Sequence, residues 1–116
     1  MDTVHKYFDN GLVKALNGIT LEISKGEICA VTGPSGCGKS TLLNLIGTLD
    51  DPTHGCIHFK EKPLMSSGSN AGYRNRQVGF VFQFHNLLGH LTLAENVAMP
   101  ALAVPKMLRS RAKKKR

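Results

Sequence analysis

Nine consecutive residues, GPSGCGKST at positions 33–41, have the types and the spacing needed to hold a phosphate group. Gly33 is followed five positions later by Gly38, Lys39 and Ser40, which satisfies the pattern of a phosphate-binding loop. Glycines let the backbone curl so that successive amides point inward and form a concavity for anions. Lys39 is expected to reach the β- and γ-phosphates as a point charge, and Ser40 to coordinate Mg²⁺. The loop therefore predicts a nucleotide-binding site.

The elements predicted on either side of the loop fit this interpretation. Residues 28–32, ICAVT, form a short apolar run that is typical of a strand buried on both faces. After the loop, apolar residues recur at helical spacing and predict an amphipathic helix of about three turns. These apolar residues are Leu42, Leu43, Leu45, Ile46 and Leu49. Asp50-Asp51-Pro52 is expected to end the helix. A loop that runs into a helix start offers phosphate the unpaired amides and the positive end of the helix dipole.

The residues before this strand predict antiparallel strands. Val4–Phe8 is expected to be a short strand, followed by a turn at residues 9–11, Asp-Asn-Gly. In residues 19–23, apolar and polar side chains alternate, which indicates a half-buried strand. Residues 24–27 are expected to form the next turn.

The residues after the helix predict two more strands. Ile57 and Phe59 alternate with polar residues, and residues 63–72 form a loop rich in Pro, Gly and Ser. The sequence VGFVF at 78–82 predicts a strand that ends at Gln83.

Residues 92–95, Thr-Leu-Ala-Glu, have the pattern of a capping box at the start of a helix. In such a box, the Thr92 hydroxyl accepts from the Glu95 amide, and the Glu95 carboxylate reaches back to the Thr92 amide. Pro100 and Pro105 are expected to limit or kink this helix.

The net charge of +7 is concentrated at one end of the chain. Six of the 15 Lys and Arg residues lie in residues 109–116, RSRAKKKR, so the rest is nearly neutral. Such a terminal run is expected to be solvated and disordered, and binding to anionic lipid or nucleic acid is the alternative. A nucleic-acid partner is disfavoured because no interleaved aromatics or groove-reading motif accompany the basic residues.

No segment resembles a signal peptide, and residues 91–108 are interrupted by charged residues and prolines, which argues against a membrane span. The three cysteines, Cys29, Cys37 and Cys56, have no CxxC spacing. They indicate neither a disulfide framework nor a zinc site, and they fit a reducing cytoplasm. Cys37 lies inside the phosphate-binding loop. The simpler interpretation is that its position accepts any small side chain, and the alternative is nucleotide binding that is sensitive to oxidation.

Two blocks of the sequence resemble the ATP-binding subunits of ABC transporters. Residues 14–55, from KALNGITLEI to TLDDPTHG, resemble the opening of such a subunit, and residues 78–100, VGFVFQFHNLLGHLTLAENVAMP, resemble its Q-loop region. TLLNLIGTLDDPT and ENVAMP are similar to the lipoprotein-releasing and macrolide-export branch. The resemblance implies an α/β fold, a P-loop NTPase core of the ABC ATPase type with an N-terminal antiparallel β subdomain. It disfavours another kind of P-loop enzyme, such as a small kinase.

The same resemblance implies roles for particular residues, with ATP and Mg²⁺ as cofactors. Gln83 is the Q-loop glutamine, which contacts Mg²⁺ or the attacking water, and Tyr7 is favoured over Phe8 as the aromatic that stacks on adenine. Residues 84–91 are expected to dock on a membrane permease, at the inner face of the cell membrane. A second ATP-binding subunit is expected as a dimer partner. The residues implied to bind ATP are Tyr7, Gly33, Ser35, Gly36, Cys37, Gly38, Lys39, Ser40 and Thr41.

The sequence also departs from the family pattern. Gly89 stands where the family often has proline, and none of the 116 residues forms an LSGGQ signature, an Asp-Glu pair after an apolar run, or a switch histidine. Residues 1–108 are therefore expected to be a partial ATP-binding domain, truncated before the complete helical subdomain, with 109–116 as a basic tail. Such a chain alone is expected to be nearly inactive as an ATPase, marginally stable and prone to aggregate. The alternative function is a remnant that only binds nucleotide or docks on a permease. The simplest origin of such a chain is a truncated or interrupted gene, and half of a split subunit is the alternative origin.

Overall fold

The computed structural model describes residues 1–64, 70–84 and 86–102. The chain divides into two compact units, Met1–Asn70 and Ala71–Arg116, which are described here separately. The first unit contains the phosphate-binding loop, and the second contains Gln83. The basic tail predicted at 109–116 lies outside the described residues.

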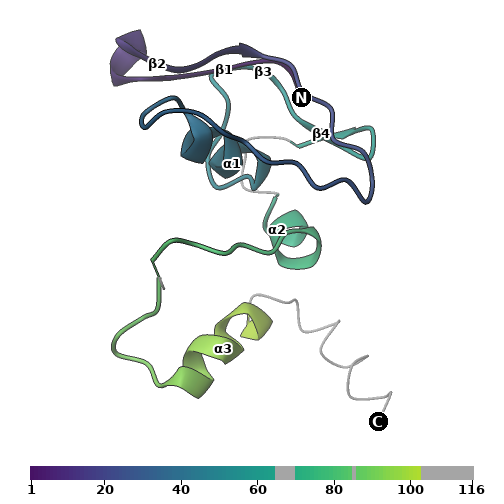
Figure 1. Cartoon of the computed structure of the whole chain (residues 1–116). Coiled ribbons are helices and arrows are strands. Elements are labelled where there is room, and N and C mark those ends of the chain that lie inside the picture. Colours follow the sequence, from purple (N-terminus) through teal and green to yellow (C-terminus); the bar gives the residue numbers. More distant parts are fainter. Residues whose placement is uncertain (65–69, 85, 103–116) are drawn as a thin grey trace. The chain divides into compact units, whose positions relative to one another are not determined.

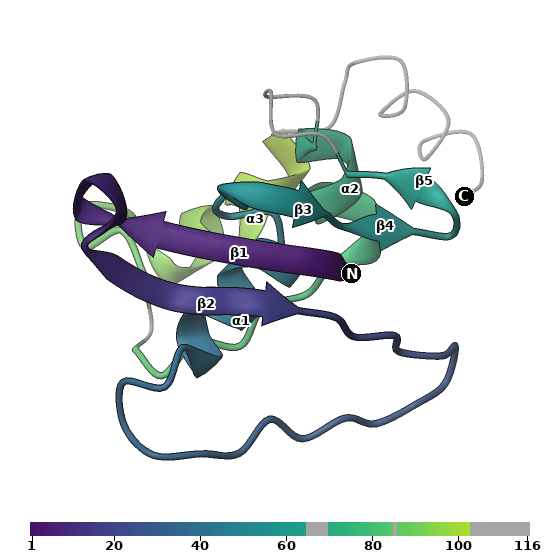
Figure 2. The same cartoon turned by 90° about the horizontal axis from the view of Figure 1, so that it is seen from above.

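The first unit contains an antiparallel sheet of three strands in the order β2-β1-β3, as Figure 2 shows. The strands are β1 (Asp2–Phe8), β2 (Val13–Ile19) and β3 (His54–Cys56). The predicted strand at Val4–Phe8 and the turn after it are confirmed, because a 3-10 turn, η1 (Asp9–Gly11), joins β1 to β2. Two irregularities in the β1–β2 register lie between Val4 and His5 and between Lys6 and Tyr7.

Helix α1 (Lys39–Ile46) packs below this sheet (Figure 1) and confirms the predicted amphipathic helix. The core combines residues of the sheet, the helix and the segment after β3. These are Val4, Leu16, Leu42, Leu45 and Ile57. Each such side chain stabilises the fold by about 1.5–3 kcal/mol when it is fully buried. The helix ends at Ile46 with Gly47 as its C-cap, before the predicted stop at Asp50.

A second, two-stranded sheet pairs β4 (His58–Phe59) with β5 (Lys62–Pro63). The buried Ile57 separates β3 from β4, and its carbonyl accepts a hydrogen bond from the Leu64 amide at 2.8 Å. The alternation at Ile57 and Phe59 therefore predicted extended structure at the right place, but as one strand instead of two.

The second unit contains helices α2 (Ala71–Gln77) and α3 (Leu93–Leu102). The capping box is confirmed: the Glu95 carboxylate accepts from the Thr92 amide at 2.8 Å, and the Glu95 amide donates to the Thr92 hydroxyl at 3.3 Å. Pro100 lies inside α3, which continues to Leu102. Among the described residues, none of the helices is both long and apolar enough to cross a membrane.

Three predictions of strands are wrong in this structure. Residues 28–32 and 78–82 form no strand, and Ile28 and Val81 are almost fully exposed. The period-2 pattern at 19–23 also misplaced a strand, because β2 ends at Ile19. A strand requires a neighbour that completes its hydrogen bonds, and no sheet in the described part of the chain extends to these segments. Helix α2 lies partly inside the predicted loop 63–72 and was missed.

Candidate nucleotide-binding site

The phosphate-binding loop is shaped by glycines with backbone angles that other residues rarely adopt. Gly36 and Gly38 have φ of +79° and +94°. A Cβ atom on Gly38 would lie 2.5 Å from the carbonyl oxygen of Ala15 in β2. Glycine is therefore required at position 38 both for its backbone angle and for its close approach to β2. The end of the loop is held against the sheet at this point.

Lys39 turns its side chain back over the loop. Its Nζ donates to the carbonyl oxygens of Gly33 and Pro34, at 2.8 Å and 2.7 Å, and lies 3.6 Å from the Cys37 sulfur. These contacts place the ammonium group inside the loop. A phosphate can replace the two carbonyls as its partner, because an ammonium has three donors and no fixed direction. Cys37 is exposed, and its thiol belongs to the same cluster.

Helix α1 begins at Lys39, directly after Gly38, and no side chain caps it. The first amides of an α-helix have no partner within the helix, and the helix dipole adds positive charge there. No acidic side chain lies in the first turn to neutralise this end. Ser40 is exposed and Thr41 is partly buried. The loop, the helix start and Lys39 together form a site of positive potential that suits an anion.

Tyr7 lies on β1, opposite Lys14 of β2. Its hydroxyl lies 2.8 Å from His5 Nδ1 and donates to Asn17 Oδ1 at 3.3 Å. The rings of His5 and His54 meet the Tyr7 ring in T-shaped contacts, with centroids 5.6 Å and 6.1 Å away. The ring is thus partly buried, with its hydroxyl hydrogen-bonded, and Lys14 Nζ lies over it, 5.8 Å from its centroid. Phe8, the alternative adenine contact, is 40% exposed and has Lys6 Nζ 5.0 Å from its centroid.

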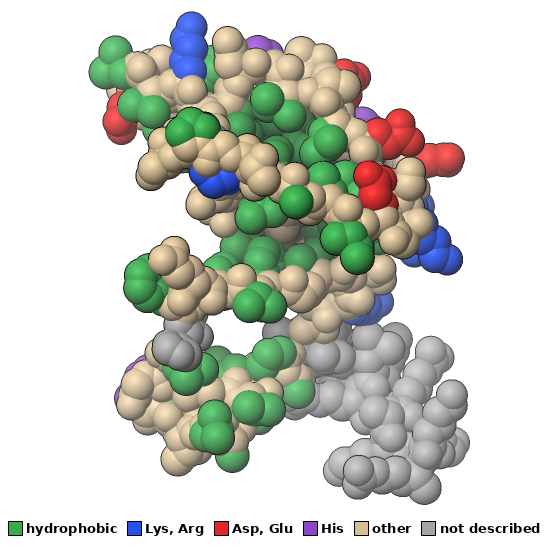
Figure 3. Space-filling model, viewed as in Figure 1, with side chains coloured by type: hydrophobic (Ala, Val, Ile, Leu, Met, Phe, Trp, Pro, Cys, Tyr) green, Lys and Arg blue, Asp and Glu red, His purple; other side chains and the backbone are tan. Residues whose placement is uncertain are grey.

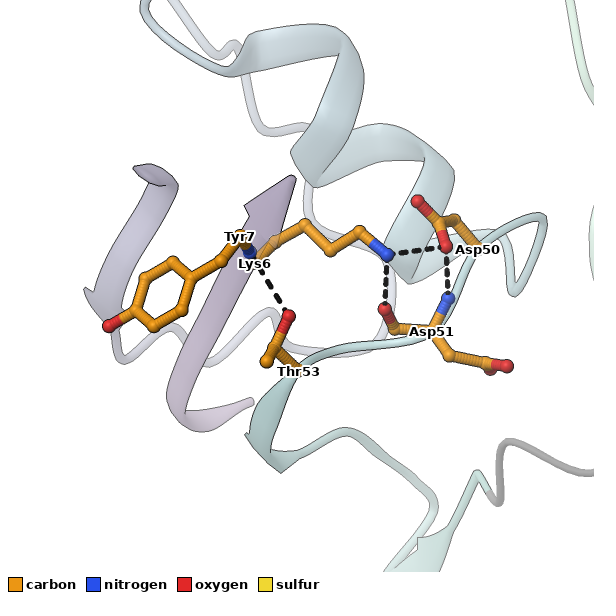
Figure 4. Close-up of polar contacts among 5 residues, drawn as sticks. All are labelled: Lys6, Tyr7, Asp50, Asp51 and Thr53. Carbon is orange, nitrogen blue, oxygen red and sulfur yellow. Dashed lines mark hydrogen bonds and ion pairs between the residues drawn. The ribbon is translucent and has the colours of Figure 1, made fainter. Parts of the chain in front are cut away.

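Sequence reasoning missed the segment that supports β1 at Tyr7. Lys6 forms an ion pair with Asp50, and the Tyr7 amide donates to the Thr53 hydroxyl (Figure 4). In the sequence, Asp50-Asp51-Pro52 indicates only a helix stop. A contact between residues 44 positions apart leaves no periodic signal in one sequence, so only the fold could show it.

Gln83 belongs to the second unit, where it is exposed and lies outside any helix or strand. Phe80 and Phe82, shortly before it, stack with centroids 5.4 Å apart. After it, the Asn96 side chain accepts from the Leu88 amide at 2.9 Å, which ties the start of α3 to the preceding segment. The structure therefore groups Tyr7 and the loop in one unit and describes Gln83 in the other.

Many large apolar side chains are at the surface (Figure 3), among them Ile28, Phe84 and Leu87. In the described part of the chain, no group of three or more His, Cys, Asp and Glu side chains could hold a metal ion.

The sequence model of the ABC transporter family matches residues 16–116. The lipoprotein-releasing system ATP-binding protein LolD 2 of Chlorobium chlorochromatii is 50% identical over 94 residues, which cover 75% of this chain and 39% of that protein. LolD of Nitratidesulfovibrio vulgaris is 52% identical over 89 residues, which cover 75% of this chain and 38% of that protein. The chain thus spans about two fifths of the length of the curated relatives it matches.

A solved structure shows the same fold. It is the dimeric post-hydrolysis state of the ATP-binding cassette MJ0796 bound to ADP and Pi. It is 36% identical, with a TM-score of 0.78, and the match covers 90% of this chain and 47% of that one. The predicted fold class is confirmed.

Proposed function

Because the chain belongs to the ABC transporter family, we propose that it is the ATP-binding portion of a transporter ATPase that energises lipoprotein release, or a macrolide-type export, through a membrane permease. The observation that carries the proposal is the glycine loop that leads into the uncapped start of α1 with Lys39 folded over it. The similarity to LolD proteins supports lipoprotein release as the transport step. The expected location is the cytoplasmic face of the membrane.

Each part of the loop has a role in this proposal. The amides of residues 33–41 bind the phosphates, Lys39 contacts the β- and γ-phosphates, and Ser40 coordinates Mg²⁺. Thr41 adds a hydrogen bond to the α-phosphate. Tyr7 offers its ring to adenine, since aromatic faces attract bases by stacking. Mg²⁺ supplies charge neutralisation between the phosphates.

Gln83 orients the attacking water or the metal, and the segment at 84–91 contacts the permease. The exposed Phe84 and Leu87 support this docking assignment, because apolar side chains at a surface are suited to a protein interface. A second ATP-binding subunit completes the site as a dimer, as dimeric MJ0796 suggests.

We propose further that a polypeptide of these 116 residues binds MgATP but turns it over very slowly. Its sequence contains no Asp-Glu pair after an apolar run and no LSGGQ signature. Removal of a general base typically slows a reaction by a factor of about 10²–10⁴. A module that only binds nucleotide or docks on the permease is the second candidate function, because the loop at 33–41 and the exposed Phe84 and Leu87 serve it without hydrolysis.

Calorimetric titration of the purified chain with MgATP tests the binding step. We expect saturable binding that Lys39→Ala weakens at least about tenfold, because an interaction with a charged group contributes about 1.5–3 kcal/mol. Lys25→Ala, in the exposed turn at 24–27, is the matched control and leaves affinity unchanged. Absence of binding by the unmodified, folded chain contradicts the proposal. Phosphate release at an ordinary ABC ATPase rate contradicts the slow turnover.

A further inference from the structure

Three consecutive residues of β1 contact the segment Asp50–Thr53, which follows α1 and is called here the clamp segment. The Thr53 amide donates to the His5 carbonyl at 2.8 Å. Lys6 Nζ donates to Asp50 Oδ1 at 2.7 Å and to the Asp51 carbonyl at 2.9 Å. The Tyr7 amide donates to Thr53 Oγ1 at 3.0 Å. The clamp segment therefore holds β1 on either side of Lys6 as well as at Lys6 itself.

The Lys6 side chain is more enclosed than that of its partner Asp50, which is 35% exposed. The lysine side chain is 13% exposed, and Asp50 Oδ1 also accepts from the Asp51 amide at 2.7 Å (Figure 4). Partial burial weakens screening by water, so this ion pair is stronger than one at the open surface. Figure 4 also shows that the Lys6 and Tyr7 side chains leave β1 in opposite directions. Lys6 thus fixes the strand without occupying the space of the Tyr7 ring.

The clamp segment is connected to the phosphate-binding loop through α1, which begins at Lys39 and ends at Ile46. The other end of this connection is Gly38, which lies against Ala15 of β2. Tyr7 pairs with Lys14, the residue before Ala15. The end of the loop and Tyr7 therefore contact neighbouring residues of β2, Ala15 and Lys14. The clamp segment, which follows α1, contacts β1 and so connects the helix to the strand that carries Tyr7.

We propose that the clamp segment positions the Tyr7 ring for the nucleotide base, with Lys6 and Thr53 as its positioning residues. The inference rests on the proposed function, in which Tyr7 contacts adenine and the loop binds phosphates. One nucleotide spans both sites, so its affinity depends on the placement of Tyr7 relative to the loop. The clamp segment contributes to the recognition of the base and not of the phosphates.

Two ligands separate these contributions: MgATP, which has a base, and magnesium tripolyphosphate, which has none. The measured quantity is the ratio of their dissociation constants in the 116-residue chain. Thr53→Val removes the acceptor of the Tyr7 amide with little change in shape, and Thr53→Ser keeps a hydroxyl. Lys6→Met removes the ion pair, and Lys25→Met is the control for loss of a lysine charge.

We expect Thr53→Val and Lys6→Met to weaken MgATP binding about threefold to tenfold, the range for one or two hydrogen bonds. Tripolyphosphate binding stays within about twofold. Thr53→Ser and Lys25→Met keep the wild-type ratio. In a Tyr7→Ala background, the clamp substitutions have no further effect on the ratio, because the ring they position is gone.

Other outcomes overturn the inference, and each has a distinct pattern. Equal loss of both ligands in Thr53→Val shows that the clamp segment only stabilises the unit. If the ratio of dissociation constants is normal in the clamp variants but changed in Tyr7→Ala, the clamp segment has no positioning role, and Tyr7 still contacts the base. If the ratio is normal in Tyr7→Ala, Tyr7 does not contact the base, and only the proposed phosphate binding by the loop is retained. If wild-type protein binds neither ligand, the proposed function itself fails.

Discussion

Lys39 shows how the loop is prepared for an anion at the scale of single residues. Its ammonium group satisfies its hydrogen bonds with two carbonyls of its own loop. A bound phosphate must replace these contacts, so the net gain is smaller than a new charged hydrogen bond alone. The benefit is a loop that keeps its lysine in place before the ligand arrives, which reduces the loss of side-chain entropy on binding.

Two glycines of the loop, Gly36 and Gly38, allow a prediction about stability, because an alanine at each position has a different space around it. Gly38→Ala places a Cβ 2.5 Å from the Ala15 carbonyl oxygen at φ +94°, whereas Gly36→Ala, at φ +79°, meets no atom within 4 Å. Backbone strain costs each variant about 1–2 kcal/mol. At position 38 alone, the clash with the Ala15 carbonyl destabilises the variant further, by the about 1–3 kcal/mol typical of overpacking.

Urea unfolding of the two glycine variants measures the difference. We expect Gly38→Ala to lower the midpoint clearly more than Gly36→Ala, and to weaken MgATP binding because the loop moves away from β2. Equal urea midpoints and equal MgATP affinities in the two variants contradict the prediction, because the close approach of Gly38 to Ala15 then affects neither stability nor binding.

At the scale of elements, the start of α3 depends on a carboxylate. Hydrogen bonds from the Thr92 backbone and side chain lower the pKa of Glu95 from its usual value of 4.5. A lowered pKa means that the folded helix start favours the ionised form. Its stabilising effect is present above the unfolded pKa and is lost as the pH falls through the lower, folded pKa.

We therefore expect the helical content of α3 to fall on acidification below about pH 4.5, which is measurable from amide NMR shifts at residues 92–96. In Glu95→Gln, the side-chain amide can still bond to Thr92, so the transition disappears but part of the helix start remains. Asp9, which lies in the first unit, serves as a control site in Asp9→Asn. A transition that persists in Glu95→Gln contradicts the assignment.

The elements also show what can be predicted from one sequence. The Thr92–Glu95 box and the apolar spacing of α1 are local patterns, and both were predicted correctly. A strand depends on a distant partner, so the apolar runs at 28–32 and 78–82 indicated extended structure but could not reveal whether a neighbour exists. Helix α2, AGYRNRQ, has no apolar period, and neither its propensity nor Asn70 before it, a residue type favoured at helix N-caps, was enough to reveal it.

The candidate site was predictable to a similar extent. The loop pattern predicts the candidate residues at 33–41 because one contiguous segment carries the whole pattern, and their role in nucleotide binding stays a proposal. The supports of Tyr7, namely Lys6, Asp50 and Thr53, come from separate segments and required the fold. Tyr7 itself was favoured from the family resemblance and remains a proposal.

At the scale of the molecule, the first unit has a small apolar core. Leu45 is fully buried in it, whereas Leu43 on the same helix is 55% exposed. Units of this size rarely gain more than about 3–5 kcal/mol from their core. Leu45→Ala typically costs about 2–5 kcal/mol, which is comparable to the whole stability of the unit.

We expect Leu45→Ala to abolish the cooperative thermal transition of the first unit, as followed by calorimetry. Leu43→Ala shifts the transition only slightly, since its side chain is half exposed and substitutions at such positions usually change stability within about 0.5 kcal/mol. Cooperative melting of Leu45→Ala at the wild-type temperature refutes the assignment of this leucine to the core.

The contact between Lys6 and Asp50 also has a consequence for the order of events during synthesis. The hairpin of β1 and β2 can form as soon as residue 19 is available, but the ion pair joins positions 44 residues apart. Ribosomes add about 5–20 residues per second, so the 37 residues from Ile19 to Cys56 take about 2–7 s, and during this time β1 lacks its second neighbour, β3. The outer edge of β1, which β3 covers in the complete sheet, is unpaired in the nascent hairpin and is a template for another strand. Slower translation of the residues between β2 and β3 therefore lengthens the period in which neighbouring nascent chains can pair with β1.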